Sequence, residues 1–552
     1  MSDRPPPVEA HIPAALAAAV SECALRAVDV GVPARLRAAD ATLWGPAGTP
    51  ELADRLGWLS IAERVRGDLA PLESLVAGVL EEGLSDVVLL GMGGSSLAPE
   101  VLRRTFGSRP GHPVLHVLDS TDAATIGAVQ AAVDLQRTLF IVSSKSGGTI
   151  EPLSLFAHFF SLVADGSRFV AITDPGSGLA ELADEHGFRA TFFGDPDIGG
   201  RYSALSPFGI VPAALTGVDV ARLLDGASQA WQTDLLGAAG EDGAGAELGA
   251  GVWLGAALSA LARAGRDKLT FLISDALPGL GLWLEQLVAE STGKHGTGIL
   301  PVAEEPAGSP GEYGEDRVFA YLPDVGAPDP ALAARMQELA GAGHPLITIP
   351  TAGPLDLGRV FMLAEIAVAV AGWGLEINPF DQPNVQQAKD ATNRVLAGYE
   401  TAHALPEVTV ADGAGVRSLL LGSAPPEYVA IMAYVKPSDE FDAAVTELRE
   451  QLRARTRATS TFGYGPRFLH STGQFHKGGP PTGRFLQLLH DGPHDIEIPG
   501  AAYTFTTLKN AQATGDLETL RGLGLPAQRV RLEGEDPVSA VRALTATIKE
   551  QT

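Results

Sequence analysis

Two short segments gather glycines, hydroxyl side chains and backbone amides in a way that suits binding of an anion. They are residues 91–96 (GMGGSS) and residues 143–149 (SSKSGGT), and each precedes a helical pattern. Glycines allow close backbone approach, and the free N–H groups at a helix start attract negative charge. The second segment adds a lysine among four hydroxyls, which is more than a helix cap needs. We therefore predict that it binds a phosphate group.

Neither segment has the spacing of a nucleotide-binding loop. The G-x-G-x-x-G spacing of dinucleotide-binding proteins is missing, and no Gly-Lys-Ser/Thr follows the glycines as it does in ATP-binding loops. A nicotinamide-dependent oxidoreductase is therefore not expected.

The elements that position these segments follow an alternating pattern. Short apolar runs that predict strands occur at residues 87–90, 114–118, 139–142, 169–172, 269–273, 318–321 and 345–349. Amphipathic segments separate them, which is typical of a parallel sheet with helices on both faces. The predicted fold class is α/β, with doubly wound three-layer domains.

Four parts are predicted along the chain. They are a helical N-terminal segment (1–82), two α/β domains (83–240 and 250–402) and a C-terminal α/β region (403–552), with a Gly/Ala/Asp-rich joint at residues 237–251. In the C-terminal region, residues 427–435 and 485–489 predict strands and residues 439–455 a charged helix. A single large sheet with an inserted loop is the alternative to two similar domains.

Composition excludes several classes of partner and site. The 40 Lys and Arg against 66 Asp and Glu give a net charge of −26, which opposes nucleic acid and anionic membranes. One cysteine, Cys23, permits no intrachain disulfide and no cysteine-based metal site. The start lacks the pattern of a secretory signal, so a cytoplasmic location is expected. The apolar stretch 360–377 is short for a bilayer span and predicts a buried core helix.

Five segments, in order, resemble the motifs of the phosphoglucose isomerase family. They are residues 91–99 (GMGGSSLAP), 144–152 (SKSGGTIEP), 199–203 (GGRYS), 286–294 (QLVAESTGK) and 377–389 (INPFDQPNVQQAK). Ala98 stands where a glycine is usual and Gly148 where a threonine is common. The resemblance implies two sugar-isomerase domains and interconversion of glucose 6-phosphate and fructose 6-phosphate, a step of glycolysis and gluconeogenesis, without metal or cofactor.

The resemblance also implies roles for individual residues. Glu290 would move the proton between C2 and C1, Arg201 would stabilise the enediolate, and Lys389 with a histidine would open the sugar ring. The residues expected to bind the substrate are Gly94, Ser95, Ser144, Lys145, Ser146, Thr149, Gln286 and Gln382. Glu290 is expected at the end of a helix over 280–289, where the dipole disfavours a carboxylate and a proton-transfer role would account for it.

The histidine of the family's site is displaced in this chain. Between the glutamate and lysine segments only His295 and His344 occur, whereas the best match, HSTGQF at residues 470–475, follows Lys389. This order resembles the isomerase half of fused transaldolase/phosphoglucose isomerases. We therefore expect the C-terminal region to fold back and bring His470 into the site. The neighbouring His476 and Lys477 are expected in a solvated loop.

Two other functions stay open beside the phosphoglucose isomerase. One is a dual phosphoglucose/phosphomannose isomerase, which would use the same base, and the other is a non-catalytic sugar-phosphate-binding regulator. In each case the partner is a small sugar phosphate, and a homodimer is left open as the state of assembly.

Overall fold

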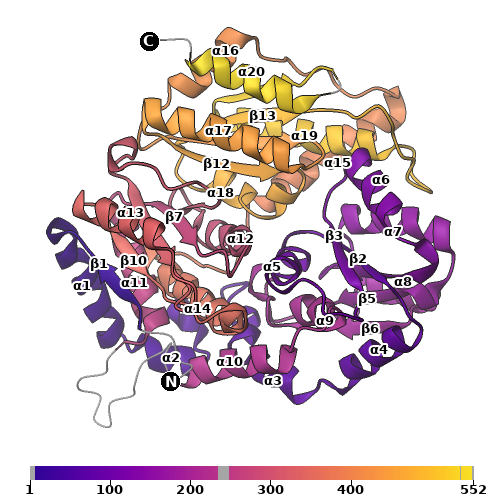
Figure 1. The fold of residues 1–552 in the computed structure, drawn as a ribbon, viewed down its shortest axis with the longest axis horizontal. Helices are drawn as coiled ribbons and strands as arrows, with labels where there is room; N and C mark the ends of the chain where they lie inside the picture. The colour runs from indigo at the N-terminus through magenta and orange to yellow at the C-terminus, as the bar shows by residue number, and fades with distance from the viewer. Residues whose placement is uncertain (1–6, 234–247, 535, 550–552) are drawn as a thin grey trace.

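Three separate sheets organise the chain, each with its own helices (Figure 1). The computed structural model describes residues 7–233, 248–534 and 536–549. Most of the predicted joint at residues 237–251 lies outside these ranges, and its end enters the helix α11 (Ala250–Arg263). The predicted α/β class with parallel sheets is confirmed, while the domain boundaries stay predictions.

The first sheet is parallel throughout and has the order β3-β2-β4-β5-β6. Its strands are β2 (Asp86–Gly91), β3 (Val114–Leu118), β4 (Thr138–Ser143), β5 (Phe169–Thr173) and β6 (Ala190–Phe193). The helices after them are α5 (Leu97–Phe106), α6 (Ala123–Ala132), α7 (Ile150–Val163), α8 (Gly178–Glu185) and α9 (Pro207–Leu215). In the register, Gly91 lies opposite Ser143, so the two predicted anion-binding segments leave neighbouring strands at the same edge.

The second sheet has the order β1-β10-β9-β7-β8 and is parallel except for β1. Its strands are β1 (Glu9–His11), β7 (Lys268–Ile273), β8 (Leu300–Val302), β9 (Arg317–Leu322) and β10 (Leu346–Thr348). The N-terminal segment, expected to be helical, thus adds a strand to α1 (Ala14–Asp29), α2 (Val32–Arg37), α3 (Ile61–Gly67) and α4 (Ala70–Glu81). The other helices of this lobe are α10 (Val220–Thr233), α11, α12 (Leu280–Thr292), α13 (Pro330–Gly341) and α14 (Leu357–Leu375).

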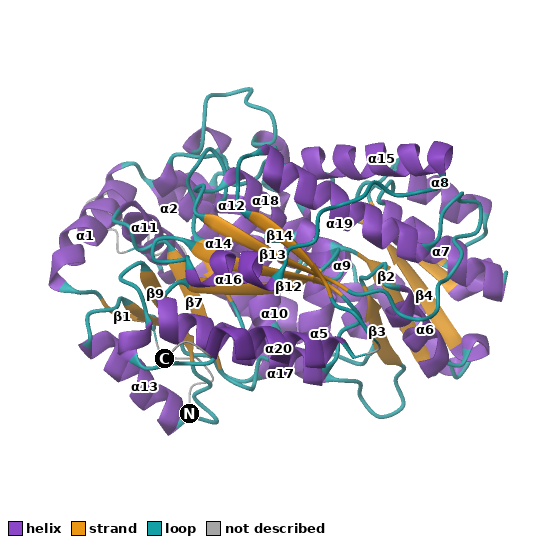
Figure 2. Ribbon diagram, turned by 90° about the horizontal axis from the view of Figure 1, so that it is seen from above, coloured by secondary structure: helices purple, strands orange, loops and turns teal. Residues whose placement is uncertain are grey.

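The third sheet, β12-β11-β13-β14, is parallel and lies in the C-terminal region. Its strands are β11 (Tyr428–Tyr434), β12 (Thr459–Tyr464), β13 (Gly483–Leu489) and β14 (Ala527–Arg531). The helices here are α15 (Val385–Ala402), α16 (Gly413–Leu421), α17 (Asp439–Thr456), α18 (Gly473–Gly478), α19 (Phe505–Gly522) and α20 (Pro537–Lys549). The helix α15 lies alongside α19 (Figure 2), so the helix that carries Lys389 packs on the third lobe.

Two ion pairs tie the third lobe to the first. Arg467 makes two hydrogen bonds of 2.7 and 2.8 Å to Asp119, which follows β3. Lys509 of α19 lies 2.9 Å from Asp122, and both side chains are buried. Toward the second lobe, Arg449 of α17 donates to the carbonyl of Ala303 at 3.2 Å. The described residues from 403 onward therefore fold back over both of the other lobes, as the position of His470 requires.

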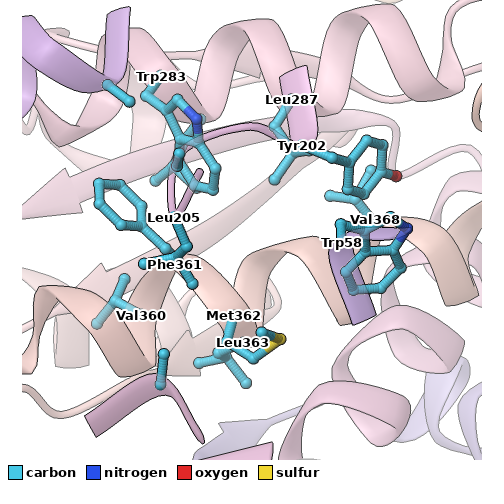
Figure 3. Close-up of a cluster of buried hydrophobic side chains, with 14 of the residues drawn as sticks. Trp58, Tyr202, Leu205, Trp283, Leu287, Val360, Phe361, Met362, Leu363 and Val368 are labelled. Atoms are coloured by element: carbon cyan, nitrogen blue, oxygen red, sulfur yellow. The ribbon is translucent and has the colours of Figure 1, made fainter. Parts of the chain in front are cut away.

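The helix α14 forms the centre of the largest apolar core. Nearly all of its residues are buried, because its apolar side chains face neighbours on every side. Phe361 of α14 packs edge-on against Trp283 of α12 with ring centroids 4.7 Å apart (Figure 3). The prediction of a buried core helix in this stretch is confirmed. None of the helices in the described ranges has the length and apolar character needed to cross a bilayer.

We expect Phe361→Ala to lower the free energy of unfolding by roughly 3–5 kcal/mol, the range for emptying a fully buried aromatic site. Phe361 has no solvent-exposed surface, whereas Phe193 is 51% exposed and makes Phe193→Ala a matched control. Urea unfolding followed by circular dichroism measures both. Equal unfolding midpoints for the two variants would contradict the assignment of Phe361 to the core.

Candidate active site

Two glycines after β2 allow three loops from different parts of the chain to touch. A Cβ atom on Gly94 would lie 2.1 Å from the carbonyl oxygen of Gly200, and one on Gly93 would lie 2.7 Å from the carbonyl oxygen of His470. Gly93 also has a φ of +55°, which L side chains rarely adopt. The glycines of the first segment therefore bring the loops carrying Arg201 and His470 against the end of β2.

Glu290 lies in the last turn of α12, close to these loops. The helix predicted over residues 280–289 continues to Thr292, so Glu290 belongs to it rather than marking its end. The amide nitrogen of Gln286, one turn earlier, donates to Glu290 at 3.2 Å and to the carbonyl of His470 at 2.8 Å. Burial raises the pKa of the Glu290 carboxyl, and the nearby charges of Arg201, His470 and Lys294 oppose this rise without cancelling it.

Arg201 is held rigidly beside Glu290. Its guanidinium is 2% exposed and donates to the hydroxyl of Ser291 at 3.0 Å. It also donates to the backbone carbonyls of Pro379 and Asp381 at 2.7 and 2.9 Å. A third nitrogen lies 3.6 Å from a carboxylate oxygen of Glu290. A cation fixed by four groups can stabilise negative charge that develops next to Glu290 without having to reorient.

Lys294 is a buried cation that the sequence analysis did not assign to the site. Its ammonium group lies 2.7 Å from a carboxylate oxygen of Asp381 and also donates to the backbone carbonyl of that residue. Burial and the charge of Arg201 lower the pKa of Lys294 to about 7, although Asp381 and Glu290 act in the opposite direction. Because Arg201 and Lys294 both hold Asp381, they anchor the segment that leads into α15.

The predicted phosphate segment forms the turn between β4 and α7. The hydroxyl of Ser144 donates to that of Thr149 at 3.0 Å, and the amide of Gly148 faces the hydroxyl of Ser146 at 3.4 Å. The ammonium group of Lys145 is paired with Asp174 instead of lying among these hydroxyls. It also donates to the carbonyl of Pro196 at 3.2 Å. The amides and hydroxyls, rather than a free cation, are therefore the groups that this turn offers to an anion.

A cavity of about 110 Å³ lies beside this turn. Among the residues that line it are Gly148, Thr149, Glu151, Lys389, His470 and Gln512. The structure thus gathers predicted residues from the first lobe, from α15 and from the third lobe around one space. Of the two alternative histidines, His295 is exposed, and His344 is buried against Phe319 of β9 with ring centroids 5.5 Å apart.

His470 is paired with Glu151, a residue that the sequence analysis also missed. The Nε2 atom of His470 lies 2.9 Å from a carboxylate oxygen of Glu151, in the first turn of α7. Burial raises the pKa of the Glu151 carboxyl, but the charge and hydrogen bond of His470 outweigh burial, so the net pKa is lowered. An ionised carboxylate can only accept a hydrogen bond, so Nε2 of His470 carries a proton, and Nδ1 is the acceptor when the ring is neutral.

One expectation is wrong, and the substrate-binding roles of two other residues stay predictions. Gln382 is exposed, whereas the neighbouring Asp381 makes the contacts to Arg201 and Lys294. His476 and Lys477, expected in a solvated loop, are buried in the short helix α18, because Lys477 pairs with the buried Asp516 at 2.6 Å. Ser95 is buried in the turn that follows β2, next to Gly94, and its role in substrate binding stays a prediction.

The described residues were also considered as ligands for a metal ion. Within residues 7–233, 248–534 and 536–549, no three or more His, Cys, Asp or Glu side chains are grouped so that they could hold an ion.

Comparison with known proteins places these residues in a family. The family model described as phosphoglucose isomerase matches residues 73–315, which include Gly94, Arg201 and Glu290. The chain is 33% identical over 418 residues to the glucose-6-phosphate isomerase of Rubrobacter xylanophilus, and the match covers 65% of this chain and 91% of that relative.

The chain belongs to the phosphoglucose isomerase family. Two solved structures share its fold. Hypothetical protein TT0462 from Thermus thermophilus has a TM-score of 0.56 and 26% identity, covering 71% of this chain and all of that one. A glucose-6-phosphate isomerase from Chlamydia trachomatis has a TM-score of 0.50 and 19% identity, covering 62% of this chain and 75% of that one. Lys389 and His470 lie beyond the stretch that the phosphoglucose isomerase model matches.

We expect Gly94→Ala to lower the free energy of unfolding by roughly 1–3 kcal/mol or more, because the added methyl group would have to displace the backbone at Gly200. Gly148→Ala is the matched control, since a Cβ atom there has no neighbour within 4 Å. Thermal and urea unfolding of the two variants would be compared with the unchanged chain. If Gly94→Ala unfolds at the same midpoint as Gly148→Ala, the close contact of the loops is not formed.

Proposed function

We propose that the protein interconverts D-glucose 6-phosphate and D-fructose 6-phosphate through a cis-enediolate, with Glu290 as the base. The observation that carries this proposal is the buried Glu290 carboxylate beside the fixed guanidinium of Arg201. Membership of the phosphoglucose isomerase family and the name of the Rubrobacter relative support it. The reaction would place the protein in glycolysis and gluconeogenesis.

The isomerisation step needs one base and one permanent cation. Glu290 takes the proton from C2 of open-chain glucose 6-phosphate, the electron pair forms the C1–C2 double bond, and negative charge develops on the carbonyl oxygen. Arg201 stabilises this charge and does not exchange protons itself. The hydroxyl proton on O2 passes to O1 as the C2–O2 bond becomes the new carbonyl, and Glu290 returns its proton to C1. Its raised pKa brings the carboxyl nearer to the working pH, so that it can both accept and release the proton.

The remaining groups prepare the substrate for that step. The turn before α7 binds the phosphate through the hydroxyls of Ser144 and Thr149 and the free amides at the helix start. His470 and Lys389, which line the same cavity, exchange the protons that open the sugar ring. The Glu151 carboxylate keeps the proton of His470 on Nε2, so Nδ1 is the ring nitrogen that can take a proton from the sugar.

We expect Glu290→Gln to lower kcat by roughly 10²-fold or more with little change in KM, because the base is lost while the substrate contacts stay. The measurement is conversion of fructose 6-phosphate, with the glucose 6-phosphate formed followed by a coupled assay.

Glu285→Gln provides the matched control for this prediction. Glu285 is a buried carboxyl on the same helix, and burial raises its pKa to about 8, so it is mostly protonated at neutral pH and resembles glutamine in charge. We expect near-normal kcat for this variant. Equal activity of the Glu290→Gln and Glu285→Gln variants would show that another residue moves the proton.

We expect His470→Gln to slow conversion of the cyclic sugars much more than proton exchange at C1 of an open-chain analogue, because only the cyclic form needs ring opening. His344→Gln, at a buried histidine beside β9, is the control and should affect neither rate. The two rates are measured by the coupled assay and by loss of a deuterium label to solvent. An equal loss of both rates in the His470→Gln variant would place His470 in the enediolate step instead.

A further inference from the structure

A buried glutamine from the third lobe contacts the carboxylate that orients His470. The amide nitrogen of Gln512, on α19, donates to Glu151 Oε1 at 2.7 Å. His470 Nε2 lies 2.9 Å from the same oxygen. Gln512 is 2% exposed, so this hydrogen bond is shielded from water. The Glu151 carboxylate thus accepts one hydrogen bond from the imidazole of His470 and a second from the amide of Gln512.

The carbonyl oxygen of the Gln512 amide is also hydrogen-bonded. It accepts a hydrogen bond of 2.8 Å from the hydroxyl of Thr121, which is fully buried between β3 and α6. Since the Glu151 carboxylate can only accept, the NH₂ group of Gln512 must face it, and the Thr121 hydroxyl then donates to the amide oxygen. A continuous chain of hydrogen bonds therefore runs from Thr121 through Gln512 and Glu151 to His470.

The helix that carries Gln512 is itself anchored at this point. Lys509, one turn before Gln512, pairs with the buried Asp122 at 2.9 Å and donates to the carbonyl of His490 at 2.6 Å. Thr121 and Asp122 are consecutive residues, so α19 is held against one short segment of the first lobe by a charged pair and by an amide. This anchoring fixes the distance between Gln512 and Glu151.

We propose that Gln512 is a positioning residue, which holds Glu151 and through it sets the ring orientation and protonated nitrogen of His470 for opening of the sugar ring. This role rests on the proposed isomerase function, because ring opening is the step that it serves. It gives residues of the third lobe a part in the chemistry beyond supplying His470, since both the imidazole and the amide that orients its partner come from that lobe.

The expected effect follows from the loss of one donor. Without the amide the carboxylate binds a proton more readily, so the pKa of Glu151 rises and the pair takes up a proton at higher pH. Other charged or titratable groups near the pair are Lys389 of α15, Glu290 of α12 and Tyr434 of β11. They are unchanged in the variant and act equally in both proteins.

The test compares Gln512→Leu with Gln487→Leu. Gln487 of β13 is also fully buried, and it donates to the carbonyl of Ala513 on the same helix α19, but its partners do not include Glu151. For Gln512→Leu we expect the acid limb of the kcat/KM profile to move upward by roughly one pH unit and kcat for the cyclic sugar to fall roughly tenfold. Proton exchange on an open-chain analogue should stay unchanged. Gln487→Leu should keep the profile of the unchanged chain.

A second readout does not depend on activity. In protein labelled with ¹⁵N-histidine, the Nε2–H proton of His470, assigned from the His470→Gln spectrum, should be protected from solvent exchange in the unchanged chain and exchange at least several-fold faster in Gln512→Leu. This result would support the positioning role even if the proposed reaction were not observed. Equal exchange in both proteins would overturn it.

Thr121→Val tests the same chain of hydrogen bonds if Gln512→Leu does not fold. Losing the donor to the Gln512 oxygen should shift the acid limb in the same direction by a smaller amount, and Thr121→Ser should restore it. An unshifted profile in folded Thr121→Val, or equal shifts in Gln512→Leu and Gln487→Leu, would show that Gln512 only supports the packing of α19.

Discussion

The contact of three backbone loops at Gly93 and Gly94 is the constraint on which the whole site depends. The loop after β2 meets Gly200, which precedes Arg201, and it meets the carbonyl of His470. No side chain separates these loops, so their relative positions are set by van der Waals contact of main-chain atoms. Gln286 then bridges from α12 to the same His470 carbonyl, which places Glu290 in the group. Parts of all three lobes are in this way brought within hydrogen-bonding distance.

The electrostatics of the site result from burial opposed by nearby charge. Glu290, Arg201 and Lys294 are each at most 5% exposed, so each charge depends on the others rather than on water. The nearby charges of Arg201, His470 and Lys294 hold the pKa of Glu290 below the value that burial alone would give, and Lys294 also pairs with Asp381. A carboxyl held between these two influences can accept a proton in one step and release it in the next.

Much of the fold could be predicted because its strands are short apolar runs followed by turn residues. The structure has β3 at residues 114–118, where the sequence predicts a strand, and it extends β4 by one residue at each end of the predicted run. The missed strands are β1, β6, β8, β12 and β14, several of them too short or too polar for periodicity to show. The antiparallel strand β1 was not predicted, because its pairing with β10 joins residues that are far apart in the sequence.

Site residues were predictable where a local sequence motif contains them. They were less predictable where their position depends on a partner that is distant in the sequence. Arg201, Glu290 and His470 lie together as expected, although their roles stay predictions. The pairing of Lys145 with Asp174 depends on the next strand of the sheet. An acidic residue in the first turn of a helix, such as Glu151, is common and does not by itself indicate a site. Lys294 ends the segment 286–294, but its type and position alone do not show that it is buried beside Asp381. Gln512 carries no local signal at all, because its partners Thr121 and Glu151 lie in another lobe.

The strand β1 has a consequence for how the chain can be handled. It pairs antiparallel with β10 and so covers the outer main-chain N–H and C=O groups of β10, which makes a three-residue strand the edge of the second sheet. An uncovered side of a sheet is a template for pairing with another molecule and hence for aggregation. Deletion of Glu9–His11 would leave the hydrogen-bonding groups of β10 open to such pairing. A purification tag or fusion attached close to Glu9 would compete with this three-residue strand for β10.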